Sequence, residues 1–147
     1  MKIERILVPF DFSEHSDKAL RWASGMAQKW NAAVMVLHVV PTPAYPPIVM
    51  ESFLDTARLE AGLKEDAEQR MKEMIGTEGA VAVESRVEVG EPFWDICRIA
   101  EEEKVDLIVM GSHGRTGLAH VLVGSVAERV VRHASCPVVV IGRKTDA

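Results

Sequence analysis

Strand-like and helix-like segments alternate along the whole chain, and this alternation most constrains the fold. The expected strands are residues 3–10, 32–40, 80–89, 105–111 and 136–142. The first, fourth and fifth are nearly continuous apolar runs, which is typical of parallel strands buried on both faces. Alternating strands and helices connect through right-handed crossovers, so the pattern predicts a mostly parallel sheet with helices on both faces.

The expected helices have recognisable starting residues. Ser13 precedes a stripe of apolar residues at helical spacing and is the expected N-cap of the first helix. Pro92 stands where the first position of the third helix is expected. Ser125 and Glu128 form an S-x-x-E pattern, which predicts a capping box at the start of the last helix.

Length and charge narrow the class of protein. A chain of 147 residues is the size of one ordinary domain, so we expect residues 1–147 to form a single domain. Its formal charge of −5 gives no basic stripe for phosphate backbones, which argues against nucleic acid as a partner. No apolar run approaches the roughly 20 residues of a membrane span, and the first residues do not resemble a signal peptide. We therefore expect a cytoplasmic protein without membrane contact.

The two cysteines, Cys97 and Cys136, lie in apolar stretches. They show neither CxxC nor metal-ligand spacing, so we expect two buried thiols in a reducing compartment rather than a disulfide.

The segment that follows the fourth expected strand is rich in glycine. In an open parallel sheet, ligands bind beyond the carboxyl ends of the strands, where the strand order reverses. If the sheet grows outward from the first strand and then returns to its other side, this point lies between the first and fourth strands. Gly111 and Gly114 would leave room there for a ligand to approach the main chain. Gly124 and Ser125 would open a helix whose N–H groups attract an anion, which makes phosphate the natural ligand.

The pattern G-x2-G-x9-G-[ST], present as Gly111, Gly114, Gly124 and Ser125, resembles the nucleotide-binding motif of the universal stress protein family. The resemblance extends through "ILVPFDFSEHSDKAL", "VLHVV", "VDLIVMGSHGRTGL" and "GSVAERVVRHASCPVVVI". It implies a Rossmann-like, doubly wound sheet of five strands in the order 3-2-1-4-5. It also implies ATP as the ligand, with Mg²⁺ or Mn²⁺, and a homodimer formed through the last strand, residues 136–141.

The same resemblance assigns roles to individual residues. Those that it places around adenine and ribose are Pro9, Asp11, Val39, Met110 and Gly111. Those that it places around the phosphates are Gly114, Gly124, Ser125 and Val126. It implies no catalytic residue and no metal ligand from the protein.

Each of these residues also has a purely structural interpretation. Gly111, Gly114 and Gly117 could form a loop with positive φ angles and no ligand. Asp11 could cap the first helix or form a turn beside Ser13. Pro9 and Val39 could simply belong to the core.

The remaining polar residues near the loop are an arginine and several histidines. Arg115 could reach a phosphate, although a loop arginine is more often solvated. His113 and His120 have no paired carboxylate or second metal ligand at recognisable spacing, so we expect solvated loop histidines. His38 is expected to be a hydrogen-bonded core histidine. The histidines expected near helix ends are His15 and His133.

Four functions fit such a chain. The leading one is a regulatory stress-response protein in which ATP occupancy biases the dimer or a partner surface. A slow ATPase or phosphotransferase is the second, because bound ATP needs only positioning and charge neutralisation to react; no Walker lysine, HRD or DFG motif supports a fast one. The third is a dimeric scaffold without nucleotide. The fourth is flavodoxin-like electron transfer, although the sequence has no flavin-specific loop after the first expected strand.

Overall fold

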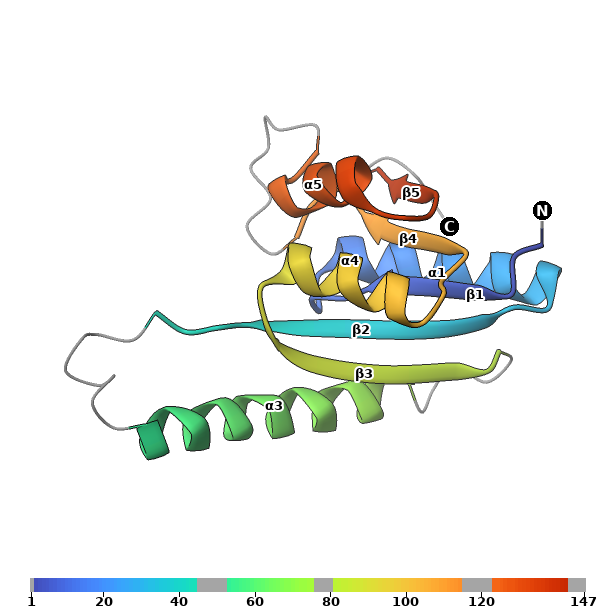
Figure 1. Ribbon diagram of the computed structural model, residues 1–147. Coiled ribbons are helices and arrows are strands. Elements are labelled where there is room, and N and C mark those ends of the chain that lie inside the picture. Colours follow the sequence, from blue (N-terminus) through green and yellow to red (C-terminus); the bar gives the residue numbers. More distant parts are fainter. Residues whose placement is uncertain (1, 45–52, 76–80, 115–122, 143–147) are drawn as a thin grey trace.

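The computed structural model describes residues 2–44, 53–75, 81–114 and 123–142. The elements, in chain order, are β1 (Arg5–Pro9), α1 (Glu14–Trp30), β2 (Ala33–Pro41), α3 (Phe53–Ile75), β3 (Val83–Gly90), α4 (Pro92–Glu102), β4 (Leu107–Gly111), α5 (Ser125–His133) and β5 (Val138–Ile141). The strands form one parallel sheet in the order β3-β2-β1-β4-β5 (Figure 1), which confirms the expected topology. Each strand begins one to three residues later than the sequence pattern predicts.

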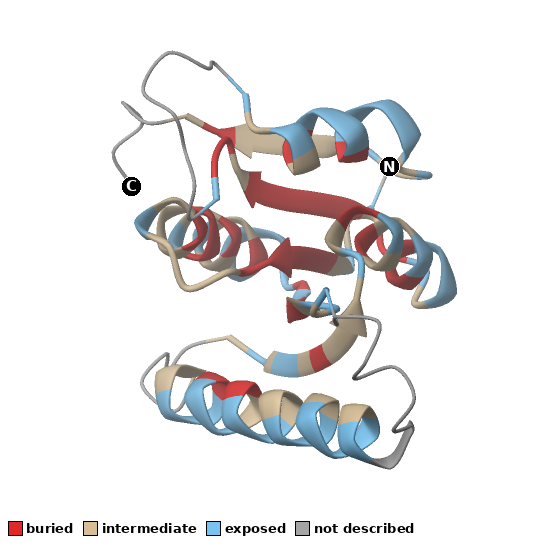
Figure 2. Cartoon of the chain, turned by 90° about the vertical axis from the view of Figure 1, so that its left-hand side faces the viewer, coloured by how far each residue is buried: buried red, intermediate tan, exposed pale blue. Residues whose placement is uncertain are grey.

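Helices cover both faces of the sheet and create two separate cores. Ile6 and Val8 point to one face, where they pack with residues of α1 and α3 such as Leu20 and Met71. Leu7 points to the other face, where it packs with residues of α4 and α5. Figure 2 shows buried residues gathered on the strands and on the helix faces turned towards them. The doubly wound arrangement predicted from the alternation is confirmed.

The starts of the helices agree with the sequence in two cases out of three. Ser13 caps α1, because its Oγ accepts a 3.2 Å hydrogen bond from the Ser16 N–H. Pro92 is the first residue of α4. The predicted capping box at Ser125 is wrong: Gly124 is the N-cap of α5, and no side chain caps that end. Gly124 donates its N–H to the Ser112 carbonyl over 2.6 Å, which holds it in the extended conformation of a cap and makes Ser125 the first helical residue.

An aspartate fixes the start of β1 against the segment that leads into β4. One carboxylate oxygen of Asp106 accepts hydrogen bonds from the N–H groups of Glu4 and Arg5, over 2.8 and 2.9 Å. The Asp106 N–H in turn donates to the Arg5 carbonyl over 3.0 Å. These bonds lie at the amino ends of the two strands, where the register of Ile6 with Leu107 begins.

Both thiols are free, as predicted, but they are half-buried rather than buried. Burial is the main cause that raises the pKa of both Cys97 and Cys136 above the ordinary thiol value. In the part of the chain that the structure describes, no helix is long and apolar enough to cross a bilayer.

Candidate functional site

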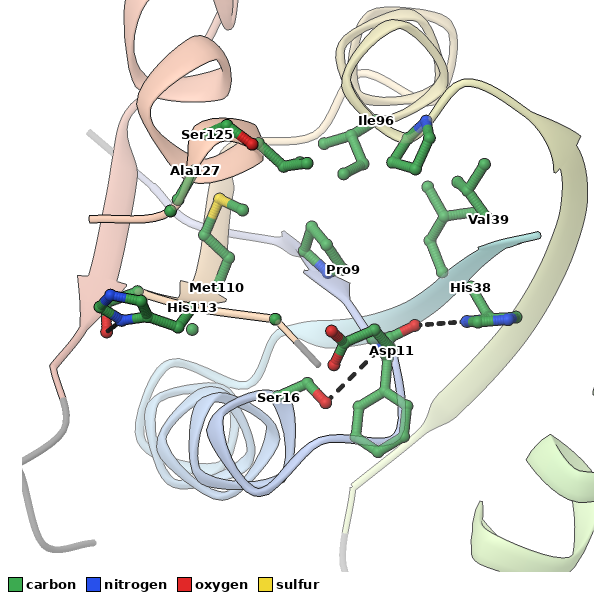
Figure 3. A pocket seen from close by; sticks show the side chains of 18 of the residues that line it. Pro9, Asp11, Ser16, His38, Val39, Ile96, Met110, His113, Ser125 and Ala127 are labelled. Carbon is green, nitrogen blue, oxygen red and sulfur yellow. Dashed lines mark hydrogen bonds between the residues drawn. The ribbon is translucent and has the colours of Figure 1, made fainter. Parts of the chain in front are cut away.

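A pocket opens at the carboxyl edge of the sheet because β1 is shorter than β2. β1 ends at Pro9, which pairs with Leu37, whereas β2 continues to Pro41. The space beyond the end of β1, between β2 and β4, is a pocket of about 590 Å³ (Figure 3). This volume lies within the usual range for small-molecule sites, roughly 300–1,000 Å³. All nine residues predicted to contact a nucleotide line it.

One end of the pocket is apolar. Pro9 comes from the end of β1, Val39 from β2 and Met110 from β4, and Figure 3 shows these side chains around one cavity. Pro92 and Ile96, from the first turns of α4, close the same end. The sheet thus provides one wall and the start of a helix another, which leaves an apolar slot suited to a flat ring.

The main chain of β2 adds polar groups to this slot. Phe10 donates its N–H to the Leu37 carbonyl over 2.8 Å, so the peptide groups of Leu37 point towards β1. The Val34 N–H donates to the carbonyl of Ala82, which directly precedes β3, over 3.0 Å. The peptide groups of the even-numbered residues of β2 therefore point towards β3. Because peptide groups alternate along a strand, the N–H and C=O of Val39 point to the β1 side, where β1 has already ended.

Asp11 joins the start of α1 to the glycine loop. Its Oδ1 accepts hydrogen bonds from the N–H and the Oγ of Ser13, over 3.1 and 2.5 Å. The structural interpretation of Asp11 as a turn residue beside Ser13 is therefore confirmed. The other oxygen, Oδ2, lies 2.6 Å from the point that a Cβ on Gly114 would occupy. The half-buried carboxylate thus stands at the border between the apolar end and the loop.

The glycines of the motif are required by close contacts within the protein. None of the described glycines has a positive φ, so that structural interpretation of Gly111 and Gly114 is wrong. A Cβ on Gly111 would lie 2.9 Å from the backbone of His15 in α1. A Cβ on Gly124 would lie 3.2 Å from the Ser112 carbonyl oxygen. Their small size lets α1 and the start of α5 approach the end of β4, which shapes the pocket before any ligand enters.

The start of α5 forms the polar end of the pocket. Gly124, Ser125 and Val126 line it, and Ala127 follows one residue further. The first N–H groups of a helix have no partner within it and carry a partial positive charge. α1 and α4 have side-chain caps from Ser13 and Glu91, whereas α5 has none. This end of the pocket therefore suits an anion.

His113 departs from its expected place. It is 6% exposed rather than solvated, and its Nδ1 is hydrogen-bonded to the Ser112 Oγ over 3.0 Å. Its ring also lies against that of His15, with the centroids 5.7 Å apart. The cause is tertiary: the first turn of α1 packs on the end of β4 and covers the loop. The predictions for Arg115, Gly117 and His120 lie outside the described residues.

The prediction for His38 is confirmed, because this histidine is buried and hydrogen-bonded to the Phe10 carbonyl. Its position on the lining of the pocket was not predicted, nor were those of Leu37, Pro92, Ile96 and Ala127. A signal existed for Pro92 and Ile96, which are one helical turn apart at a helix start that must face the carboxyl edge of a parallel sheet.

These features define an α/β protein of the doubly wound class, whose pocket combines an apolar slot with a helix N-terminus. A group of three or more His, Cys, Asp or Glu side chains able to hold a metal is absent from the described residues. Residues 2–142 match the model of the universal stress protein family, and the chain belongs to that family.

Relatives of known sequence and structure agree with this placement. The chain is 34% identical to universal stress protein MJ0531 of Methanocaldococcus jannaschii, covering 94% of this chain and 81% of that protein. It is 34% identical to the solved structure of MJ0577 from the same organism, with a TM-score of 0.83, covering 99% of this chain and all of that one. It is 26% identical to a universal stress protein of Archaeoglobus fulgidus solved in complex with dAMP, with a TM-score of 0.60, covering 96% of this chain and 99% of that one.

Proposed function

We propose that this protein binds ATP and acts as a nucleotide-dependent regulator in the stress response. The observation that carries the proposal is a single pocket in which an apolar slot, an aspartate and an uncapped helix start follow one another. Their order matches the order of base, ribose and phosphates in a nucleotide. The relative solved with dAMP supports an adenine nucleotide as the ligand class.

The base is recognised by the main chain of β2. In the proposed complex, the Val39 N–H donates to N1 of adenine, and the Val39 C=O accepts from its 6-amino group. Guanine carries a donor at N1 and an acceptor at C6, so the same two groups would oppose it. Leaving such groups unpaired typically costs about 1–3 kcal/mol each. We therefore expect ATP to bind more tightly than GTP.

The sugar and phosphates follow along the pocket. Asp11 accepts hydrogen bonds from the ribose hydroxyls, and Met110 and Gly111 line the same side. Gly114, Gly124, Ser125 and Val126 surround the phosphates, with the N–H groups of α5 directed at the negative charge. Mg²⁺ or Mn²⁺ bound with the nucleotide would supply positive charge and so lower the negative charge that approaches Asp11.

Regulation is favoured over efficient catalysis because the sequence has no Walker lysine, HRD or DFG motif. Asp11 is bonded through Oδ1 to the N–H and Oγ of Ser13, and in the proposed complex it lies at the ribose rather than at the phosphates. Slow hydrolysis of bound ATP is the alternative activity. We place the protein in the cytoplasm, where ATP is abundant.

The homodimer is also proposed. β5 lies at one edge of the sheet, and Val138, Val139 and Val140 are only half-buried. An unpaired apolar edge strand favours pairing with another chain. Light scattering during size-exclusion chromatography would show a mass of two chains. Val140→Pro would reduce it to one: the Pro137 and Ile141 carbonyls accept bonds from the β4 side, so the alternate residue Val140 turns its N–H to the outer edge of the sheet.

Release and titration of nucleotide test the proposed ligand. The protein is purified without added nucleotide and denatured, and the released small molecules are identified by mass spectrometry; the emptied protein is then titrated with ATP and Mg²⁺ in a calorimeter. Ser125→Ala removes a phosphate contact without removing a cap, because Ser125 makes no cap bond. A hydrogen bond to a charged group contributes about 1.5–3 kcal/mol, so ATP should bind about 10- to 150-fold more weakly.

Ser85→Ala is the matched control, because Ser85 is an exposed serine on β3 outside the pocket. It should leave the ATP affinity unchanged. If the wild-type protein releases no nucleotide and gives no heat with ATP and Mg²⁺, the scaffold function replaces this proposal.

A further inference from the structure

The hydrogen-bond ladder between β1 and β2 ends at the bond from the Phe10 N–H to the Leu37 carbonyl. The Phe10 N–H still donates to the Leu37 carbonyl over 2.8 Å. In a parallel ladder the next bond would run from the Val39 N–H to the Phe10 carbonyl. Within the part of the chain that the structure describes, the Val39 N–H and the Phe10 carbonyl are not bonded to each other, and the strand pairing ends at Pro9 with Leu37.

The Phe10 carbonyl is bonded to a side chain instead. Nδ1 of His38 lies 2.7 Å from this oxygen, as Figure 3 shows by a dashed line. A carbonyl oxygen can only accept, so Nδ1 carries the proton and donates it. His38 is 8% exposed, so the bond is shielded from water.

The ring of His38 is held in place by its neighbours. The Phe12 ring packs against it, with centroids 4.8 Å apart and an angle of 62° between the planes. Phe12 has a φ of 64°, a left-handed conformation that a bulky residue rarely adopts. The guanidinium of Arg70, from α3, stacks on the Phe12 ring, 4.0 Å from its centroid. The Phe12 ring is thus in contact with both the His38 ring and the Arg70 guanidinium.

We propose that His38 is a positioning residue of the nucleotide site: it holds the Phe10 carbonyl so that the Val39 N–H stays available for the base. The inference rests on the proposed function, because it assigns a purpose to the Val39 N–H. Without a donor at position 38, the buried Phe10 carbonyl would lack a partner, which is unfavourable. The Val39 N–H is the donor that the ladder itself offers, so β1 and β2 would pair one residue further and close the floor of the slot.

Three variants test the role of the donor. His38→Leu removes it, whereas His38→Gln keeps an N–H group that can reach a carbonyl. The matched control is His133→Leu, because His133 makes the same type of contact, 2.8 Å from Nδ1 to the Arg129 carbonyl, at the far end of α5. Circular dichroism of each variant would show whether it is folded.

Three probes separate the base from the phosphates. They are ATP, 1-deaza-ATP, which lacks the N1 acceptor, and inorganic tripolyphosphate. In the wild type, 1-deaza-ATP should bind about 2- to 13-fold more weakly than ATP, the usual effect of one hydrogen bond. In His38→Leu, ATP should weaken by a similar factor, its advantage over 1-deaza-ATP should vanish, and tripolyphosphate should bind as before. His38→Gln and His133→Leu should behave like the wild type.

Two results of these binding measurements would overturn the inference. One is a His38→Leu protein that still prefers ATP to 1-deaza-ATP by the wild-type factor. The other is an equal loss for ATP and tripolyphosphate, which would indicate general damage to the pocket. A wild-type protein that binds no ATP would instead refute the proposed function.

Hydrogen exchange tests the inference even without nucleotide. In the ligand-free protein, exchange of the Val39 amide, followed by NMR, should be slower in His38→Leu than in the wild type, because the amide becomes bonded to Phe10. In His38→Gln it should stay as fast as in the wild type. An unchanged Val39 exchange rate in His38→Leu would also overturn the inference.

Discussion

The Gly111→Ala substitution separates two reasons for a glycine at the end of β4. If the glycine only makes room for a ligand, alanine would leave the nucleotide-free protein as stable as before. The structure predicts a loss, because the added Cβ would lie 2.9 Å from the carbonyl carbon, the oxygen and the Cβ of His15. Two of these atoms belong to the backbone of α1, which cannot rotate away as a side chain would.

The size of the loss follows from two opposing effects. Overpacking of this kind costs typically about 1–3 kcal/mol. The φ of Gly111 is not positive, so alanine can adopt the backbone conformation and gains about 0.4–1 kcal/mol from the less flexible unfolded chain. With the middle of each range, about 2 and about 0.7 kcal/mol, the net loss is about 1.3 kcal/mol, which at roughly 2–4 °C per kcal/mol lowers Tm by about 3–5 °C.

Urea and thermal unfolding of the emptied protein, followed by circular dichroism, measure this loss. Gly62→Ala is the matched control, because Gly62 lies within α3 and a Cβ there meets no atom within 4 Å. It should stabilise the protein by about 0.5–1 kcal/mol, since alanine favours helix. Equal stability of Gly111→Ala and the wild type would refute the packing explanation. It would favour the alternative, that the glycine makes room for a ligand.

Two further predictions concern helix starts and thiols. Ser13→Ala should lower the free energy of unfolding by about 1 kcal/mol, as the loss of an N-cap usually does, whereas Ser125→Ala should leave it nearly unchanged, because Ser125 makes no cap bond; urea unfolding of both variants would show the difference. Burial raises the pKa of Cys97 and Cys136, so at pH 8 iodoacetamide should react with them more slowly than with a model thiol. Because the folded state favours the neutral thiols, their contribution to stability is present at neutral pH and is lost as the pH rises through the raised pKa values. The control is a variant with both cysteines replaced by alanine. If the free energy of unfolding of the wild type rose above pH 9 relative to this variant, the prediction would be contradicted.

The layered fold was predictable because its signals are local. β1 and β4 are short apolar runs, and burial on both faces is seen in neighbouring residues such as Ile6 and Leu7, which point to opposite faces and are both fully buried. The helix starts at Ser13 and Pro92 were predictable for the same reason, since a cap depends on a few neighbouring residues.

Features that depend on contacts between distant segments were not predictable. His113 is buried because α1 packs on the loop that contains it, and nothing near His113 in the sequence shows that contact. The cap of α5 moves from Ser125 to Gly124 because the Ser112 carbonyl, twelve residues away from Gly124, accepts its N–H. The contribution of His38 depends on where β1 stops relative to β2, which is a property of the pair of strands.

The bonds between Asp106 and the start of β1 have a consequence at the opposite edge of the sheet. The pocket is bordered by the carboxyl ends of β1 and β4, and its depth depends on how far one strand end stands beyond the other. Asp106 sets that offset from about 15 Å away, the length of a five-residue strand, because it pins the first residues of β1. A strand in a sheet slides as a unit and exchanges its faces with each residue of slip. Asp106 thus contributes to the dimensions of the pocket from a position outside its lining.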